Sequence, residues 1–158
     1  KCNLEISDIK KMTIWGNHSP TMYPDLDNAE IKGESASGWI NDQNWIESDF
    51  LRIVQQRGKA IIDARGASSA TSAANAAIDT VKATLSETPA DDWFSAAVLS
   101  DGSYNVPEGL IFGFPLKVDA NGNVSIVQDL PISDYAQEKI DLTTKELLDE
   151  RSDIQDLL

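Results

Sequence analysis

Two apolar runs separated by Asn121-Gly122 place the strongest constraint on how this chain can fold. Asn-Gly readily adopts the positive φ angles of a tight hairpin turn, so residues 110–118 and 124–127 are predicted to be neighbouring antiparallel strands. A further strand is predicted at 93–99, before a turn at Asp101-Gly102. Antiparallel strands of this kind indicate an α+β fold, with a twisted sheet, hairpins and long helices, and not a parallel nucleotide-binding sheet.

Upstream of these strands, the apolar residues follow the period of a helix. From Trp45 to Ala64 one face stays apolar for about six turns. Asn41 or Asp42 is the expected N-cap, and Gly66 suits the C-terminal end. The sequence therefore predicts one long helix across this region.

Glycine and small residues mark two further features of the helical region. Gly58 lies inside the long helix, where glycine costs roughly 1 kcal/mol relative to alanine, so it indicates a bend or a close approach. Ser68 or Ser69 is a natural N-cap for a second helix of small residues that runs to Ile78. We expect this helix to pack closely on another helix in the core, on a ligand or in a dimer contact, and its first amides suit a carboxylate. A last, acidic helix is predicted from Ser133 onwards.

Length and charge limit the class of protein. A chain of 158 residues fits one domain, 1–158, with a real core. The net charge of −13 excludes nucleic acid and anionic membranes as expected partners, because both would be repelled. No apolar run reaches the roughly 20 residues of a membrane helix, and no signal peptide is recognisable, so a soluble, cytoplasmic protein is expected. One cysteine, Cys2, and one histidine leave no metal-ligand cluster, so no metal is expected.

The only histidine, His18, is the candidate for proton transfer. The short run 11–14 is predicted to be a strand that stops near Trp15-Gly16, and His18 lies just after this strand end. Histidine is the side chain that exchanges a proton near neutral pH, and Trp15 and Gly16 are expected to give it a partly apolar setting. Pro20 and Pro24 predict a stiff, irregular loop after it. A hydrogen-bonded or surface loop histidine remains the alternative, and residues 17–19 also form a glycosylation sequon.

Other catalytic signatures are absent from the sequence. There is no Gly-x-Ser-x-Gly nucleophile motif, no Gly-x-Gly-x-x-Gly dinucleotide fingerprint and no phosphate loop. Arg57 and Arg65 are the best candidates to bind an anionic substrate, although each also suits an ion pair or an interface. The chain by itself therefore has no recognisable cofactor site.

Six further segments follow one another along nearly the whole chain. They are Ile14-Trp15-Gly16-Asn17-His18-Ser19-Pro20, Tyr23-Pro24-Asp25, Val54-Gln55-Gln56-Arg57-Gly58, Ser68-Ser69-Ala70-Thr71-Ser72-Ala73-Ala74, Ser100-Asp101-Gly102 and Leu130-Pro131-Ile132. In this order they resemble the C-terminal, substrate-binding half of the malate dehydrogenases, a branch of the lactate/malate dehydrogenase family, and they look most like the cytosolic type.

This resemblance implies roles for particular residues. His18 matches the histidine that accepts the hydroxyl proton of malate while the hydride leaves for NAD, and returns it to oxaloacetate in the reverse direction. Ser68 and Ser69 match the helix start that lines the substrate and nicotinamide pocket, and Gly58 matches the helix bend beside it. The small-residue helix, through Ala73, Ala74 and Ala77, matches a contact of the family's homodimer. The reaction implied belongs to the tricarboxylic acid cycle.

The resemblance also shows what this chain lacks. The family's NAD fingerprint, its substrate-binding arginines and the aspartate that pairs with the histidine all lie upstream of the matching segment. The isolated chain is therefore predicted to be inactive without an N-terminal half, since His18 would lack the carboxylate that stabilises its charged form. A catalytically inactive, stand-alone interaction or dimerisation domain with the same fold is the alternative. Another 2-hydroxy acid as substrate, and NADP in place of NAD, remain open.

Overall fold

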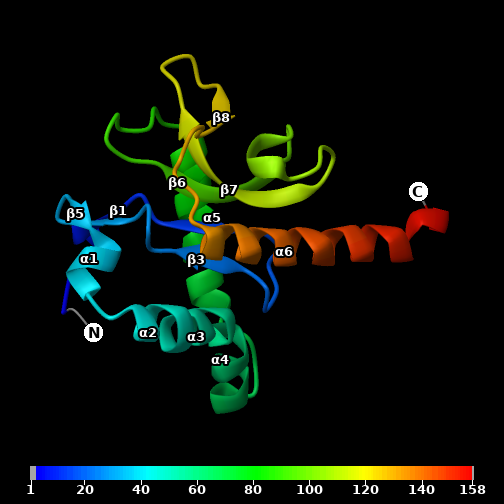
Figure 1. Ribbon diagram of the computed structural model, residues 1–158, viewed down its shortest axis with the longest axis horizontal. Coiled ribbons are helices and arrows are strands. Elements are labelled where there is room, and N and C mark those ends of the chain that lie inside the picture. Colours follow the sequence, from blue (N-terminus) through cyan, green and yellow to red (C-terminus); the bar gives the residue numbers. More distant parts are fainter. Residues whose placement is uncertain (1–2, 158) are drawn as a thin grey trace.

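Antiparallel strands and flanking helices make up the fold, which Figure 1 shows in a computed structural model that describes residues 3–157. The strands are β1 (Ile9–Lys10), β2 (Thr13–Trp15), β3 (Tyr23–Asp25), β4 (Glu30–Ile31), β5 (Glu34–Ser35), β6 (Phe94–Leu99), β7 (Ile111–Val118) and β8 (Val124–Ile126). The α-helices are α1 (Ala36–Ile40), α2 (Gln43–Trp45), α3 (Leu51–Gln55), α4 (Arg57–Arg65), α5 (Ala70–Thr84) and α6 (Asp134–Asp153). A π-helix, η2 (Ile46–Phe50), joins α2 to α3, and short 3₁₀ turns are η1 (Ile6–Asp8), η3 (Ser103–Asn105) and η4 (Gln155–Leu157). The predicted α+β fold is confirmed.

Strands β6, β7 and β8 form an antiparallel sheet in that order. Leu116 of β7 pairs with Phe94 on one side and with Ile126 on the other, so these apolar side chains share one face. The predicted turn at Asn121-Gly122 is confirmed: Gly122 has a φ of 83° and donates its N–H to the Asp119 carbonyl at 3.0 Å. The three predicted strands of this region are therefore present.

A second sheet, β2 with β3, lies across β6 and β7. The N–H of Gly16 donates to the Gly113 carbonyl at 3.2 Å, and the N–H of Gly113 donates back to the Gly16 carbonyl at 3.0 Å. Nearby, the N–H of Ile14 donates to the Ser95 hydroxyl of β6 at 3.0 Å. A Cβ on Gly113 would lie 2.6 Å from the Ile14 carbonyl oxygen, so only glycine fits where the two backbones meet.

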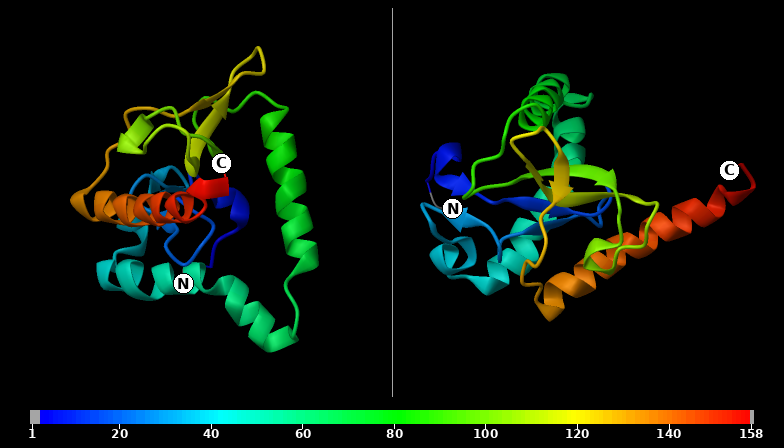
Figure 2. Two further views of the ribbon diagram at one scale, coloured as in Figure 1. Left: turned by 90° about the vertical axis from the view of Figure 1, so that its right-hand side faces the viewer. Right: turned by 90° about the horizontal axis from the view of Figure 1, so that it is seen from above.

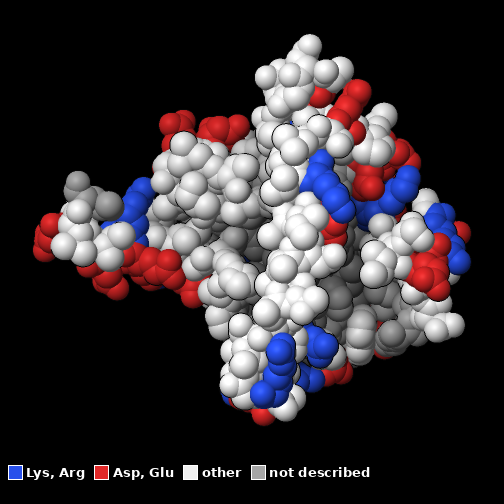
Figure 3. Space-filling model, turned by 180° about the vertical axis from the view of Figure 1, so that it is seen from behind, with Lys and Arg blue, Asp and Glu red and all other residues white. Residues whose placement is uncertain are grey.

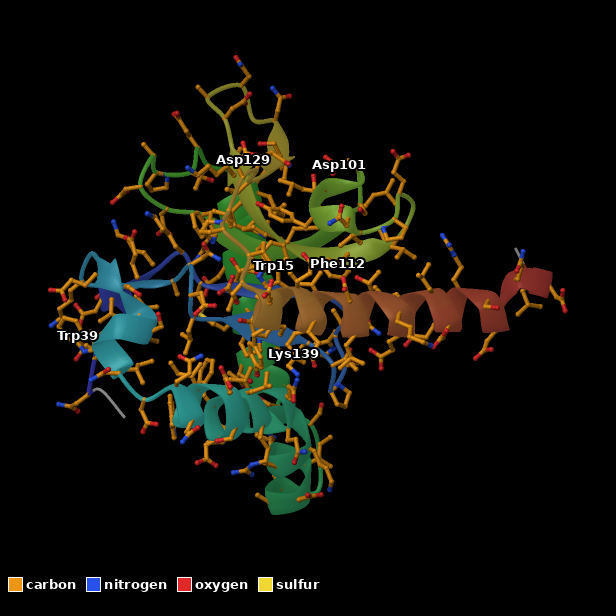
Figure 4. All side chains as sticks on the ribbon, in the orientation of Figure 1. Trp15, Trp39, Asp101, Phe112, Asp129 and Lys139 are labelled. Atoms are coloured by element: carbon orange, nitrogen blue, oxygen red, sulfur yellow. The ribbon has the colours of Figure 1, made fainter. Side chains whose placement is uncertain are left out.

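The main apolar core lies between the β6–β8 sheet and α6. Figure 4 shows Trp15 and Phe112 in this layer. The fully buried members include Trp15, Phe112, Phe114, Leu116 and Ile140. The buried residues of α6 all lie between Ala136 and Thr144, and in Figure 1 its C-terminal half extends beyond the sheet. Over the described residues, none of the helices has the combination of length and apolar character needed to cross a membrane.

A smaller apolar cluster joins β4, α1 and η2. Its buried members are Leu26, Ala29, Ile31, Ala36 and Ile46. Beside it an apolar cavity of about 490 Å³ is lined by side chains that include Leu4, Met12, Trp45, Phe50 and Val54. Strand β4, helix α1 and η2 therefore pack around a second, smaller core, while β2 and β3 contribute Trp15 and Tyr23 to the main one.

Strand β3 corrects one prediction. The sequence predicts an irregular loop through Pro20 and Pro24, but Pro24 lies in β3, opposite Ile14 of β2. Each strand of a two-stranded sheet has one edge that makes no ladder bonds, and a proline fits at such an edge because its missing N–H is not needed there. Pro20 lies in the turn between the strands, as predicted.

The predicted long helix is present but interrupted. Its ends are as expected: Asp42 accepts the N–H of Trp45 at 3.1 Å, and Gly66 closes α4 with a φ of 74°. Between them η2 widens the helix, and a break occurs at Gln56, with φ −102° and ψ 8°. The bend predicted at Gly58 is therefore wrong in position. Gly58 lies within α4, and a Cβ there would meet no atom within 4 Å.

Helix α5, rich in alanine and serine, packs less closely than expected. Within residues 3–157 it has no buried residue, and its main contact is with strand β6 and not with a helix. Ile78 and Val81 are 54% and 56% exposed. Figure 2 (left) shows α5 standing along one side of the molecule. The prediction of close packing in the core is wrong, because the break at Gln56 directs α4 and α5 away from the body until the chain returns at β6.

We expect alanine at two glycines to change stability in opposite directions. Gly113→Ala forces apart the backbones of β2 and β7 and should lower the free energy of unfolding by about 1–3 kcal/mol. Gly58→Ala adds a methyl group in open space on a helix. It should raise the free energy of unfolding by about 0.3–1 kcal/mol. Urea titrations of both variants measure the changes. Equal effects of the two substitutions would contradict the close approach at Gly113.

Candidate active site

The loop that carries His18 begins where β2 ends. Gly16 makes the last hydrogen bonds to β7 and has a φ of 97°, which turns the chain out of the strand. A Cβ on Gly16 would lie 2.2 Å from the Cγ2 atom of Thr143 on α6, so this side chain occupies the space that glycine leaves. His18 therefore lies just beyond a strand end, the position that the sequence predicts.

The ring of His18 is exposed, and within residues 3–157 no group forms a hydrogen bond or ion pair with it. Trp15 does not provide the apolar setting that was expected. Its indole is fully buried in the core. It packs edge to face with the rings of Tyr104 and Phe114, at distances of 4.8 Å and 6.2 Å between ring centroids. Side chains alternate along a strand, so Trp15 faces the core at the end of β2. The imidazole is thus free to contact a group from outside the described chain.

The far end of the same hairpin is fixed by a buried carboxylate. Asp25 is 0% exposed, and it accepts hydrogen bonds from Trp15 Nε1 at 3.0 Å and from Asn28 Nδ2 at 2.9 Å. It also accepts the backbone N–H groups of Asp27 at 2.8 Å and Asn28 at 3.2 Å. Burial raises the pKa of the neighbouring Tyr23 hydroxyl, and the charge of Asp25 raises it further. Asp25 is fully hydrogen-bonded and serves to hold β3 in place.

Helix α6 holds the loop through one carboxylate. A single oxygen of Glu146, Oε2, accepts from Asn17 Nδ2 at 3.2 Å and from Thr21 Oγ1 at 2.6 Å, and it also accepts from the Ser19 hydroxyl. Ser19 in turn accepts the backbone N–H of Thr21 at 3.0 Å. A second carboxylate, Glu150, accepts from Asn17 Nδ2 at 3.1 Å. The residues on both sides of the histidine are therefore bonded to the helix.

Thr143 adds a buried contact to the same loop. Its Oγ1 accepts the backbone N–H of Asn17 at 2.9 Å. It also lies 2.9 Å from Thr21 Oγ1, whose single hydroxyl proton is shared between Thr143 Oγ1 and the closer Glu146 Oε2. Burial acts to raise the pKa of Glu146, but the hydrogen bonds from Ser19, Thr21 and Asn17 outweigh it and hold that pKa below its ordinary value. Glu146 therefore favours its charged form, which is the form that accepts these bonds.

The other predicted site residues lie on the arm formed by α4 and α5. Gly58 is exposed in the first turn of α4, and Ser68 and Ser69 lie in the connection between the helices. Ser69 occupies the N-cap position of α5, but its hydroxyl pairs with the Ser72 hydroxyl and makes no bond to the free backbone N–H groups. The predicted N-cap position of Ser69 is therefore confirmed, but its hydroxyl makes no capping hydrogen bond because it has a competing partner. Within the described residues no bond joins these three residues to His18.

Basic side chains gather around α4. Arg57 lies at a cavity of about 310 Å³ whose lining includes Arg52 and Lys59. Arg52 pairs with Asp49 at 3.0 Å and Lys59 with Asp63 at 2.7 Å, while no carboxylate among residues 3–157 pairs with Arg57. Figure 3 shows basic side chains at this end of the molecule.

Arg65, the other cation predicted on the long helix, stays close to its own segment: it donates to the Ser68 carbonyl at 3.3 Å. Within the described range, no three metal-ligating side chains are grouped to hold an ion. Cys2 lies outside that range.

Sequence reasoning missed the residues that hold the loop. Thr143 and Glu146 lie in the acidic helix that the sequence predicts from Ser133 onwards, where no pattern sets them apart as contacts of a loop, and Asp25 enters only as part of the family resemblance. One signal was available for Thr143. It lies three residues after the buried Ile140, on the stripe of α6 that faces the core.

Comparison with known proteins gives a consistent likeness. A family model described as the lactate/malate dehydrogenase alpha/beta C-terminal domain matches residues 1–157. A malate dehydrogenase from Naegleria fowleri is 40% identical, with a TM-score of 0.90 over 99% of this chain and 48% of that chain. A lactate dehydrogenase from Trichomonas vaginalis, in complex with NADH and oxamate, is 28% identical, with a TM-score of 0.87 over 97% of this chain and 48% of that chain.

A more distant structure shares the fold. The malate dehydrogenase from Plasmodium falciparum is 22% identical, with a TM-score of 0.81 over 99% of this chain and 49% of that chain. The chain therefore spans about half the length of each of these structures.

Two adjacent threonines of α6 provide a matched test of the loop contact. Thr143→Val leaves the Asn17 N–H without an acceptor, so the free energy of unfolding should fall by about 1–3 kcal/mol. Thr144 Oγ1 is buried without a partner in the described structure, so Thr144→Val should leave the free energy unchanged or raise it by up to about 1 kcal/mol. Urea unfolding compares them. A larger loss in Thr144→Val than in Thr143→Val would contradict these contacts.

The lowered pKa of Glu146 predicts a pH dependence of stability. A carboxyl whose folded pKa is depressed stabilises the fold fully above its unfolded value, here near 4.5, and the contribution is lost as the pH falls through the lower folded pKa. Glu146→Gln should therefore be less stable than the wild type at pH 7, with the difference shrinking toward pH 3. Thermal melts across this range measure it, with Glu138→Gln as a control on the same helix. A difference independent of pH would contradict the prediction.

Proposed function

The chain belongs to the lactate/malate dehydrogenase family, and from this premise we propose that it is the C-terminal catalytic half of an NAD-dependent malate dehydrogenase, which interconverts malate and oxaloacetate. Two observations support malate over lactate as the substrate. Identity is 40% to a malate dehydrogenase and 28% to a lactate dehydrogenase. The resemblance of residues 14–20 and 54–58 is to the cytosolic-type malate dehydrogenases, which also supports a cytoplasmic location.

The observation that carries the proposal is the placement of His18. It is the only histidine in the chain, it lies just beyond a strand end, and its ring has no partner among residues 3–157 while its neighbours are held by α6. In the proposed reaction the neutral imidazole accepts the hydroxyl proton of malate as the C–H bond breaks, and the resulting imidazolium returns a proton to oxaloacetate in reverse. NAD, when bound, accepts the hydride.

The described chain does not itself supply a dinucleotide site. Its sheets are antiparallel, whereas the glycine-rich dinucleotide fingerprint needs a strand, a tight turn and a helix of a parallel unit. In this proposal NAD is bound mainly by an N-terminal half of the same enzyme, which also provides the cations that bind the dicarboxylate. The exposed His18 ring faces the substrate that this second half delivers.

Gly58, Ser68 and Ser69 are proposed to lie along the substrate pocket, as the family resemblance implies. The amides of the first turn of α5 support this role, since the Ser69 hydroxyl is engaged with Ser72 and leaves them unsatisfied. Unpaired N–H groups at the start of a helix favour a negatively charged group such as a carboxylate of malate.

A homodimer is proposed through the exposed face of α5. Ala73, Ala74 and Ala77 allow close approach of a second backbone, and the neighbouring Ile78 and Val81 are more than half exposed. Figure 3 shows α5 as a largely uncharged column on this side of the molecule. Burial of this face would stabilise the helix, which has no buried residue in the isolated chain.

A second candidate function is a stand-alone interaction or dimerisation domain that has this fold and no catalysis. The observation that favours it is the absence of a glycine-rich dinucleotide motif and of a phosphate loop from the 158-residue sequence. The complete reading frame separates the two: an upstream half with a glycine fingerprint after its first strand supports the enzyme, and a start codon near Lys1 supports the interaction domain.

We expect the product of the complete gene to reduce NAD with malate and to act poorly on lactate. His18→Asn should lower kcat by about 10²- to 10⁴-fold, since it removes the proton acceptor, and should leave the melting temperature unchanged because the ring is exposed. NADH absorbance with each substrate measures the activity. Near-normal turnover by His18→Asn would contradict the role of His18, and a preference for lactate would contradict the substrate.

A further inference from the structure

The loop between β2 and β3 combines an exposed histidine with neighbours that are firmly bonded. Three of its side-chain hydrogen bonds converge on one carboxylate of α6, Glu146, which accepts from Asn17, Ser19 and Thr21. We infer that Glu146 is a positioning residue for His18: by holding Asn17, Ser19 and Thr21 it fixes where the imidazole is presented. This inference rests on the proposed function for its catalytic meaning, but the positioning itself is a property of the described chain.

Backbone pairing alone does not hold this part of the loop. The ladder between β2 and β7 ends at Gly16, and the next backbone bond within the loop is from Met22 N–H to the Ser19 carbonyl at 3.1 Å. Between these points the side-chain bonds to α6 determine the path of the chain. Bonds to an ionised carboxylate are about twice as strong as those between neutral groups. Glu146 accepts three such bonds from the loop and Glu150 accepts one, so Glu146 makes the strongest contact.

The helix that carries Glu146 is itself anchored in the core. Ile140 and Thr143, which precede Glu146 by two turns and one turn, are 1% and 0% exposed. Residues three apart on a helix lie on the same face, so the face that packs into the core also presents Glu146 to the loop. A group held by a rigid, packed element keeps a more definite position than a group on a free loop.

Positioning of this kind matters for a proton acceptor. A base acts efficiently only when its nitrogen lies within hydrogen-bond reach of the proton it removes, and a displacement of about 1 Å can cost about 100-fold in rate. His18 has no partner of its own in the described chain to orient it. The bonds to Asn17, Ser19 and Thr21 are therefore the constraint on its position that this chain provides.

The first test uses the 158-residue chain and needs no activity. Because the chain has one histidine, the ring C–H signals in a carbon-13 NMR spectrum belong to His18 without ambiguity. Glu146→Ala should lower the order parameters of the His18 ring and of the amides at 17–21, and Glu146→Gln, which keeps one acceptor oxygen, should restore part of the loss. Glu138→Ala is the matched control, since Glu138 is on the same helix but contacts Lys139.

Variants on the loop side guard against a helix defect. Ser19→Ala with Thr21→Val removes two hydroxyl donors without changing α6 and should loosen His18 as Glu146→Ala does. The inference would be overturned if the order parameters of the His18 ring and of the amides at 17–21 were unchanged in Glu146→Ala. If Glu146→Ala does not fold, the same result in the Ser19→Ala, Thr21→Val variant would overturn it.

The second test uses the product of the complete gene. Glu146→Ala should lower kcat by about 10- to 100-fold with little change in KM for malate, and Glu146→Gln should recover part of kcat. Loss of activity only in proportion to loss of folded protein would show a structural role and overturn the catalytic meaning. If the wild-type product does not turn over malate, the proposed function fails, while the NMR comparison still decides whether Glu146 positions His18.

Discussion

The backbones of β2 and β7 meet at hydrogen-bonding distance through Gly16 and Gly113, and the position of the candidate site depends on this contact. Because Gly113 has no side chain, β2 can lie directly against β7, and because Gly16 adopts a φ of 97°, the chain leaves β2 toward α6. Thr143 fills the space beside Gly16. A strand, a sheet and a helix therefore meet at one point. Contacts between backbones cannot relax by a change of rotamer, so this point is rigid.

Two buried polar groups hold the ends of the loop that starts there. Thr143 accepts the N–H of Asn17 at the beginning of the loop, and Asp25 accepts four hydrogen bonds just after its end. Buried polar groups stabilise a structure only when they are paired, and both of these are. Between them Glu146 bonds the side chains that flank His18. This arrangement explains how a side chain can be exposed and still be carried by an ordered segment.

Helices α4 and α5, which form an arm at one side of the molecule, are not held by a buried core. Neither helix has a buried residue in the described chain, so packing does not explain why they form. Alanine has the highest helix propensity, which favours α5, but an isolated helix of about 15 residues is only marginally stable without tertiary support. The exposed small side chains of α5 are suited to a surface that another half of the enzyme or a second subunit covers, in line with the proposed function.

Local patterns in the sequence determined which segments become helices and strands. Asn121-Gly122 predicted the β7–β8 turn, Asp42 and Gly66 predicted the ends of the long helical region, and the strands of the main sheet followed from their apolar runs. These features depend on φ preferences, caps and side-chain period, which neighbouring residues fix. The same reasoning placed His18 at a strand end and, through the resemblance, identified the family.

Tertiary structure decided what those segments contact. The break falls at Gln56 and not at Gly58, Pro24 takes part in a strand, and α5 lies outside the core. The support of the His18 loop by Thr143 and Glu146 joins residues more than 120 positions apart, and no local pattern encodes such a pairing. A carboxylate on an acidic helix has the same local sequence pattern whether it faces solvent or a loop. The tertiary fold, which brings the loop at 17–21 against α6, determines that Glu146 faces the loop.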